Sequence, residues 1–173
     1  MRCIAFMRNV NQGQRGHPST SDIVAGFVDA GCPDIQTFQS NGTILFDSDE
    51  PASAVEQAGD AVAARSGHER EILWIPLSEL ATIVDEYGAT PEPRRFEFTL
   101  HHGAIIDPND AGVISRATDH RCAIVDAGEG WALVRNQVEG EGHATPVLES
   151  LTGRPATSRG LPTVIRLVSR FGR

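Results

Sequence analysis

The chain has 173 residues and a formal net charge of -8 at pH 7, with 23 acidic side chains against 15 basic ones. This length fits one compact domain or two tightly joined halves, and it allows burial of about two thirds of the unfolded surface without a disulfide or metal. Net negative charge disfavours nonspecific binding to nucleic acid or anionic lipid, because both need a positive contact surface. Every basic residue is arginine, which suits bidentate recognition of oxyanions, although a genome-wide codon bias explains the same composition.

The three cysteines indicate reduced thiols. Cys3, Cys32 and Cys122 are odd in number and far apart, so they form neither a disulfide framework nor a zinc-ligand spacing. The sequence also shows no secretory signal pattern and no apolar run of membrane-spanning length. We expect a soluble, cytoplasmic protein with no cofactor and no membrane partner.

The first stretch of the chain predicts a strand that leads into a ligand loop. An apolar run from Cys3 to Met7 is followed at once by the polar, glycine-spaced segment from Arg8 to Gly16. In mixed α/β proteins, ligands often bind where a buried strand ends in such a loop. This loop is therefore the first candidate site.

Residues 1–76 predict the order strand, helix, strand, strand, helix, strand. The expected ranges are 3–7, 19–31, 35–40, 43–46, 49–67 and 72–75. Helix caps support both helices, since Ser19 and Asp22 suit an N-terminus and Gly31 and Gly67 suit C-termini. Asn41-Gly42 is a strong hairpin signal. This order is the ferredoxin-like βαββαβ arrangement, so we expect an α+β protein whose first half has that topology.

Residues 77–173 predict a smaller α/β half that ends in two helices. The expected helices are 78–86, 111–115, 145–153 and 162–171, and the expected strands are 95–100, 121–126 and 131–135. Thr145 and Pro146 suit the start of the third helix, with the Thr145 hydroxyl as its cap. Residues 157–160 are expected to form a turn, and no internal repeat is visible in the sequence.

Four residues suggest an anion site formed by both ends of the chain. Arg8, Asn11, Gly13 and Arg159 together offer two guanidinium groups and loop amides, which could hold a phosphate or carboxylate. A structural alternative is that Arg8 pairs with an acid at the sheet edge while the Asn11 side chain bonds its own backbone. The loop lacks the ending of a phosphate-binding P-loop and the dinucleotide fingerprint.

Other chemistries receive less support from the sequence. His101, His102 and the aspartates that follow resemble metal ligands, but adjacent residues at a strand end point to opposite sides, so a solvated turn is the better interpretation. The serine and threonine hydroxyls lack a neighbouring base or nucleophile elbow. The arginine-rich end of the chain, which includes Arg173, has no interleaved aromatic residues for base stacking. No residue pattern identifies a reaction.

Three short motifs resemble the bacterial DUF1697 family of proteins of unknown function. That family opens with Leu-Arg-Gly-Ile-Asn-Val-Gly-Gly, has Ser-Gly-Asn in its hairpin and has Thr-x-Arg-Asn-Trp-x-Thr near its end. The first motif is similar to residues 7–14, which keep Arg8, Asn11 and Gly13. The hairpin keeps Gly42, and the last motif keeps Arg159 and Thr163, so the resemblance extends over nearly the whole chain.

The resemblance implies a shared fold and a shared site, but no known activity. It suggests that the three motifs meet, so that Arg8, Asn11, Gly13, Gly42, Arg159 and Thr163 surround one small anionic ligand. A second hypothesis is a protein-interaction or homodimerisation module that uses an exposed sheet edge or face. A third, which the composition disfavours, is weak nucleic-acid binding through the arginine-rich last helix.

Overall fold

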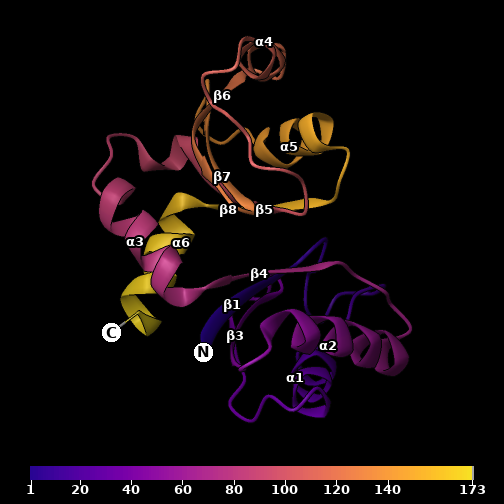
Figure 1. The fold of residues 1–173 in the computed structure, drawn as a ribbon. Coiled ribbons are helices and arrows are strands. Elements are labelled where there is room, and N and C mark those ends of the chain that lie inside the picture. The colour runs from indigo at the N-terminus through magenta and orange to yellow at the C-terminus, as the bar shows by residue number, and fades with distance from the viewer. Residues whose placement is uncertain (173) are drawn as a thin grey trace. The chain divides into compact units, whose positions relative to one another are not determined.

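The computed structural model describes residues 1–172, which form two compact units (Figure 1). The first unit is Met1–Glu79 and the second begins at Leu80. Each unit contains one four-stranded antiparallel sheet with helices. The predicted α+β class is therefore confirmed. Within residues 1–172, no helix is both long enough and apolar enough to cross a membrane.

The first unit follows the expected order of elements. Its elements are β1 (Arg2–Met7), α1 (Thr20–Asp29), β2 (Gln36–Phe38), β3 (Thr43–Asp47), α2 (Pro51–Ser66) and β4 (Ile72–Pro76). The strands lie in the order β2-β3-β1-β4, and every neighbouring pair is antiparallel. The arginine-bearing loop thus leaves one of the two central strands of this sheet.

Local sequence signals explain both helices of the first unit. The Ser19 hydroxyl accepts a hydrogen bond from the Asp22 amide, and the Asp22 carboxylate accepts one from the Ser19 amide, which completes a capping box. Helix α2 has Pro51 in its first turn and ends at Gly67, whose φ of 75° is left-handed. These end signals account for the accuracy of the predicted ranges.

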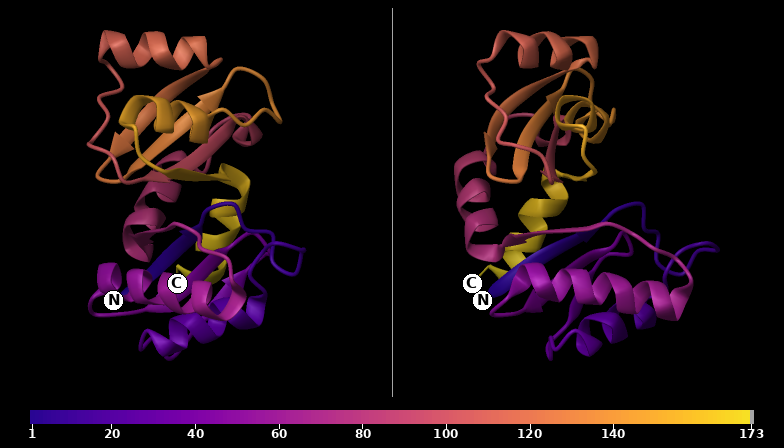
Figure 2. Two further views of the ribbon diagram at one scale, coloured as in Figure 1. Left: turned by 90° about the vertical axis from the view of Figure 1, so that its right-hand side faces the viewer. Right: turned by 45° about the vertical axis from the view of Figure 1, so that its right-hand side comes forward.

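Helices α1 and α2 cover one face of the first sheet (Figures 1 and 2). Alternate residues of β1 (Cys3, Ala5 and Met7) point to these helices and are almost fully buried. Phe27 of α1 packs on Phe46 of β3 with ring centroids 5.3 Å apart. This apolar layer holds the strand that carries the candidate loop.

The second unit contains the remaining elements. They are α3 (Leu77–Tyr87, which begins before the boundary), a 3-10 turn (Pro93–Arg95), β5 (Phe96–His101), α4 (Ala111–Asp119), β6 (Cys122–Gly128), β7 (Trp131–Asn136), α5 (Ala144–Thr152), β8 (Ala156–Gly160) and α6 (Leu161–Phe171). The antiparallel strands lie in the order β6-β7-β5-β8. Helices α4 and α5 share an apolar cluster with residues of β6, β7 and β8.

The two units repeat one topology that the sequence does not reveal. From β5 to β8 the second unit again reads strand, helix, strand, strand, helix, strand, with the same spatial order of strands. A specific contact recurs as well. The Met7 amide donates to the Gly42 carbonyl at 2.7 Å, and the His101 amide donates to the Gly130 carbonyl at 2.9 Å. Both glycines have a φ of 74°.

Three local expectations for the second unit are wrong. Residues 157–160 belong to strand β8 and not to a turn, because β8 pairs with β5 from Glu97 opposite Gly160 to His101 opposite Ala156. The N-cap of α5 is His143, and the Thr145 hydroxyl bonds to Ser158 at 2.7 Å instead of capping the helix. Helix α4 extends to Asp119, beyond the short helix predicted.

Two glycines inside the helices of the first unit should respond oppositely to alanine. A Cβ on Gly26 of α1 would overlap Cγ2 of Val62 and lie 3.1 Å from the Ala58 carbonyl, both on α2. A Cβ on Gly59 of α2 would meet only Ile72 Cδ1, at 3.7 Å. We expect Gly26→Ala to lower the free energy of unfolding by about 1–3 kcal/mol, because α1 and α2 must separate.

The matched variant Gly59→Ala should raise the free energy of unfolding by about 0.5–1 kcal/mol, since alanine restricts the unfolded chain and the site has room for it. Urea unfolding of both variants measures the difference. Equal effects of the two substitutions would show that α1 and α2 do not pack as closely as described.

Candidate functional site

The loop after β1 is a series of tight turns. Left-handed backbone occurs at Asn9, Gly13 and Gly16, with φ values of 53°, 83° and 82°. Asn9 adopts a conformation that asparagine tolerates better than most residues, and the two glycines adopt it without steric cost. Both Gly13 and Gly16 are exposed, and a Cβ on either would touch nothing within 4 Å. These glycines therefore serve backbone conformation and not close packing.

Gln12 joins the loop to the β2–β3 hairpin and to α1. Its side-chain oxygen accepts a hydrogen bond from the Gly42 amide at 3.1 Å, and its side-chain nitrogen donates to Thr20 Oγ1 at 2.8 Å. Its own amide donates to the Ser40 carbonyl at 2.8 Å. One side chain and one amide thus connect three segments that are separate in the sequence.

Gly42 is needed where the hairpin meets the loop. A Cβ there would lie 2.9 Å from Met7 Cβ and 3.0 Å from Val10 Cβ. Its positive φ is also unfavourable for other residues. Gly42, a predicted site residue, is buried and shapes the loop through its backbone.

Arg70 and His17 hold the loop from its outer end. The Arg70 guanidinium donates to the carbonyls of Asn9, at 3.1 Å, and Gly16, at 2.9 Å. His17 Nδ1 accepts a hydrogen bond from the Asn11 amide at 3.1 Å. Sequence reasoning did not find Gln12, His17 or Arg70, and Arg70 carries no signal because it lies far along the chain from the loop.

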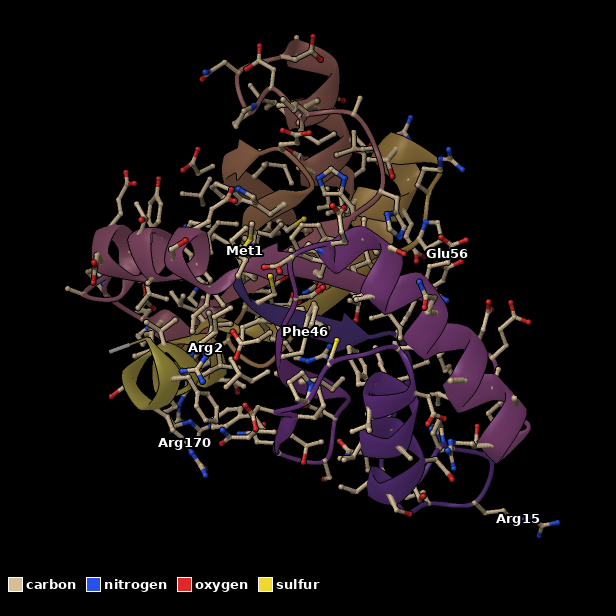
Figure 3. The ribbon with its side chains drawn as sticks, turned by 60° about the horizontal axis from the view of Figure 1, so that its bottom comes forward. Met1, Arg2, Arg15, Phe46, Glu56 and Arg170 are labelled. Carbon is tan, nitrogen blue, oxygen red and sulfur yellow. The ribbon has the colours of Figure 1, made fainter. Side chains whose placement is uncertain are left out.

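Three backbone amides of the loop make no hydrogen bond with the described part of the chain. Within residues 1–172, the amides of Gly13, Arg15 and Gly16 donate no hydrogen bond. The Arg15 side chain extends away from the loop (Figure 3). Residues 8–17 contain two arginines and a histidine but no acid. The loop is thus a local concentration of donors and positive charge on an acidic chain.

The six predicted site residues divide between the two units. Arg8, at the end of β1, is half-buried, and its amide donates to the Glu71 carbonyl at 2.9 Å. Asn11 and Gly13 are exposed in the same loop, next to Gly42 of the hairpin. The Asn11 side chain makes no hydrogen bond within residues 1–172, so the interpretation that it bonds its own backbone is wrong. The Asn11 backbone amide donates to His17 Nδ1 instead.

The other two predicted residues lie in the second unit. Arg159 of β8 is buried, and its guanidinium donates to Thr157 Oγ1 at 3.1 Å and to the Ser158 carbonyl at 2.9 Å. Burial lowers the pKa of Arg159 to about 10. Thr163 of α6 accepts a hydrogen bond from Arg166 through Oγ1 at 3.3 Å. Arg8 belongs to the first unit and Arg159 to the second, and the approach of these two arginines stays a prediction.

The polar network around Glu97 and Glu141 in the second unit has a structural role. The Glu97 carboxylate accepts hydrogen bonds from the Ala144 amide at 3.1 Å and from Asn136 Nδ2 at 2.9 Å. A carboxylate at this position stabilises the N-terminus of α5. Glu141 bonds His143 and Arg121, each at 2.8 Å, and the two partners lower the pKa of Glu141. This network orders the β7–α5 connection.

Thiol and metal chemistry find no support among the described residues. Cys3, Cys32 and Cys122 are buried free thiols, and burial raises the pKa of Cys3 and of Cys122 to about 11. Such thiols carry almost no thiolate at neutral pH and are poor nucleophiles. Within residues 1–172, no group of three or more His, Cys, Asp or Glu side chains is arranged to hold a metal ion.

Comparison with known proteins gives a family and a fold. The model of a family described as "Protein of unknown function (DUF1697)" matches residues 1–126. The segment from Thr157 to Thr163 also resembles a motif of this family, but it lies outside the matched residues. The conserved bacterial protein SP0830 from Streptococcus pneumoniae has a similar structure, with a TM-score of 0.63 and 14% identity over 99% of this chain and 98% of that chain. No curated protein sequence matches.

Removing the Arg70 guanidinium should loosen the loop without unfolding the unit. Arg70→Ala deletes the donors to the Asn9 and Gly16 carbonyls. We expect amide hydrogen exchange at Asn11 and Gln12 to accelerate about tenfold, because hydrogen bonds from charged groups contribute about 1.5 kcal/mol or more. Exchange followed by NMR measures this at single amides.

Arg65→Ala is the matched control for Arg70→Ala. Arg65 forms an exposed ion pair with Asp29 at 2.7 Å, away from the loop. Its loss should leave exchange in the loop unchanged and cost at most about 1 kcal/mol. Unchanged loop exchange in Arg70→Ala would mean that the arginine does not hold the loop.

Proposed function

The chain belongs to the DUF1697 family of proteins of unknown function, and we propose that its opening loop binds a small anion bearing a phosphate or carboxylate group. The supporting observation is that Gly13, Arg15 and Gly16 offer amides that bond no other group within residues 1–172. Successive amides around left-handed residues form concave nests that bind anions. The proposal concerns binding and includes no reaction.

The charge around these amides favours an anion over a cation. Arg15 adds a full positive charge to the same loop, and the loop has no carboxylate between Arg8 and His17. Guanidinium groups pair with phosphate and carboxylate oxygens through two parallel hydrogen bonds. Local positive charge on a chain of net charge -8 also directs an anion to this loop and away from the rest of the surface.

The start of helix α1 is not the proposed binding point. The Ser19 hydroxyl already accepts a hydrogen bond from the Asp22 amide, and the Asp22 carboxylate, which accepts one from the Ser19 amide, repels an anion there. Binding therefore relies on the turns of the loop, which Gln12 and Arg70 hold in place before a ligand arrives. Preorganised donors bind more tightly because less conformational freedom is lost.

We further propose that Arg159 and Thr163 contribute to the same ligand, as the motif resemblance suggests. We also propose that each unit belongs to the ferredoxin-like class. The support for the class is the βαββαβ order of elements with the antiparallel strand orders β2-β3-β1-β4 and β6-β7-β5-β8.

Titration of the 15N-labelled chain with inorganic phosphate tests the proposed function. We expect saturable shifts of the Gly13, Arg15 and Gly16 amides, followed by two-dimensional NMR, with sodium chloride at the same ionic strength as a reference. Acetate in a parallel titration separates carboxylate from phosphate binding. Shifts at Arg159 and Thr163 would support their contribution to the ligand.

Arg15→Gln should weaken phosphate binding about fivefold, which corresponds to about 1 kcal/mol. Arg65→Gln removes an arginine of the same unit outside the loop and should bind phosphate like the unmodified chain. Linear shifts that sodium chloride reproduces would contradict the proposal, and so would equal weakening by the two variants.

A further inference from the structure

We propose that His101 is an acid-sensitive latch that holds the segment 102–110 of the second unit and releases it when the imidazole is protonated. His101 is the last residue of β5, and the segment connects it to α4. The proposal rests on the burial of the imidazole, on the partners of its two ring nitrogens and on the packing of the segment it holds.

The imidazole is buried and only one of its nitrogens has a partner. The residue is 3% exposed, and Nδ1 accepts a hydrogen bond from the Gly103 amide at 3.1 Å. Since Nδ1 acts as an acceptor, the ring proton lies on Nε2 in the neutral form. Among the described residues, Nε2 of His101 is a buried side-chain atom without a hydrogen-bond partner.

The other polar residues on this side of β5 are satisfied. Glu97 bonds to the start of α5, and Thr99 bonds to Ser158 of β8 at 2.8 Å. His101 follows them at intervals of two residues, so its side chain lies on the same face of the strand. A buried polar atom left without a partner costs about 1–3 kcal/mol, and such an atom in a native structure calls for an explanation.

The segment after His101 is packed against α5. A Cβ on Gly103 would overlap the side chain of Thr152, the last residue of α5. Ile106 is buried in the apolar cluster that includes Leu148 of α5. The bond between Gly103 and His101 therefore joins the end of β5 to a segment fitted closely on the helix.

Protonation reverses the role of Nδ1. With a proton on both ring nitrogens, the imidazolium is a donor only, so the Gly103 amide loses its acceptor and faces a like dipole. The ring then also carries a charge in a buried site, which is costly without a partner. Both effects act on the same contact and favour release of the segment.

The groups facing His101 do not compensate for that charge. Burial is the main cause that lowers the pKa of His101, the neighbouring His102 lowers it further, and the Trp131 carbonyl of β7 opposes this only in part. On β8 the residue opposite is Ala156, and its amide donates to the Glu149 carboxylate of α5 at 3.2 Å. Burial therefore outweighs the Trp131 backbone, and the neutral imidazole is the favoured form.

The sign of the pH effect follows from this lowered pKa. Between the pKa of His101 in the folded chain and the value of about 6.5 typical of an unfolded chain, the unfolded or opened state binds the extra proton. Stability is therefore fully present above about pH 6.5 and declines as the pH falls toward the pKa of the folded chain. The segment 102–110 should open before the rest of the unit does.

Hydrogen exchange of the full chain at about pH 7.5 and about pH 5 tests the latch, after correction for the intrinsic pH dependence of exchange. We expect protection of residues 103–106 to fall about tenfold or more relative to β7. His101→Asn keeps an acceptor near the Gly103 amide but cannot be protonated in this range. In this variant, protection of residues 103–106 relative to β7 should therefore be the same at both pH values. His102→Asn changes the exposed neighbour, which only adds to the lowering of the pKa of His101, and should keep the acid-dependent loss of protection.

NMR titration of the unmodified chain keeps the test independent of how well the variants fold. The His101 ring signals and the Gly103 amide should change with the same midpoint. The proposal is overturned if His101→Asn retains the acid-dependent loss of protection, or if the ring titrates while the Gly103 amide and its exchange stay unchanged.

Discussion

A backbone hydrogen bond between the end of the first strand and a left-handed glycine organises each unit. In the first unit, the Met7 amide reaches the Gly42 carbonyl at 2.7 Å, at a point too crowded for any side chain on Gly42. This contact brings the loop of Arg8 to Gly16 against the β2–β3 hairpin. Gln12 of the loop then bonds to the Gly42 amide and the Ser40 carbonyl of the hairpin. A longer separation would leave Gln12 without its two partners in the hairpin, the Gly42 amide and the Ser40 carbonyl.

Much of the fold follows from local signals in the sequence. Apolar runs, caps such as Ser19 and Gly67, and the glycine of the hairpin correctly identify the elements of the first unit. Strand β8 was missed because Thr157 to Gly160 is polar and glycine-ended, and only pairing with β5, far earlier in the chain, makes it a strand. The repeated topology was missed for a related reason: it is preserved in backbone contacts, while the side chains at equivalent positions, such as Met7 and His101, differ in chemistry.

The sequence indicates which loop to consider as a candidate site, but it does not give the internal geometry of that loop. The glycine-spaced polar loop marks the place, and its arginines mark the charge. Which amides remain available depends on turn conformations at Gly13 and Gly16, and the groups that hold the loop come from elsewhere. Arg70 illustrates the limit, since nothing near it in the sequence indicates that its guanidinium bonds carbonyls at both ends of the loop.

The hydrogen bond from the end of the first strand to a left-handed glycine occurs in both units, as Met7 to Gly42 and as His101 to Gly130, and it leaves the connection that follows free to differ in chemistry. Because this hydrogen bond joins only main-chain atoms, it does not depend on which side chains the following connection carries. The connection after β1 carries Arg8 and Arg15, whereas the connection after β5 carries Asp107, whose side chain accepts a hydrogen bond within a turn, and Asp110, which caps helix α4. The same backbone arrangement therefore supports two connections of different surface charge, one in each unit.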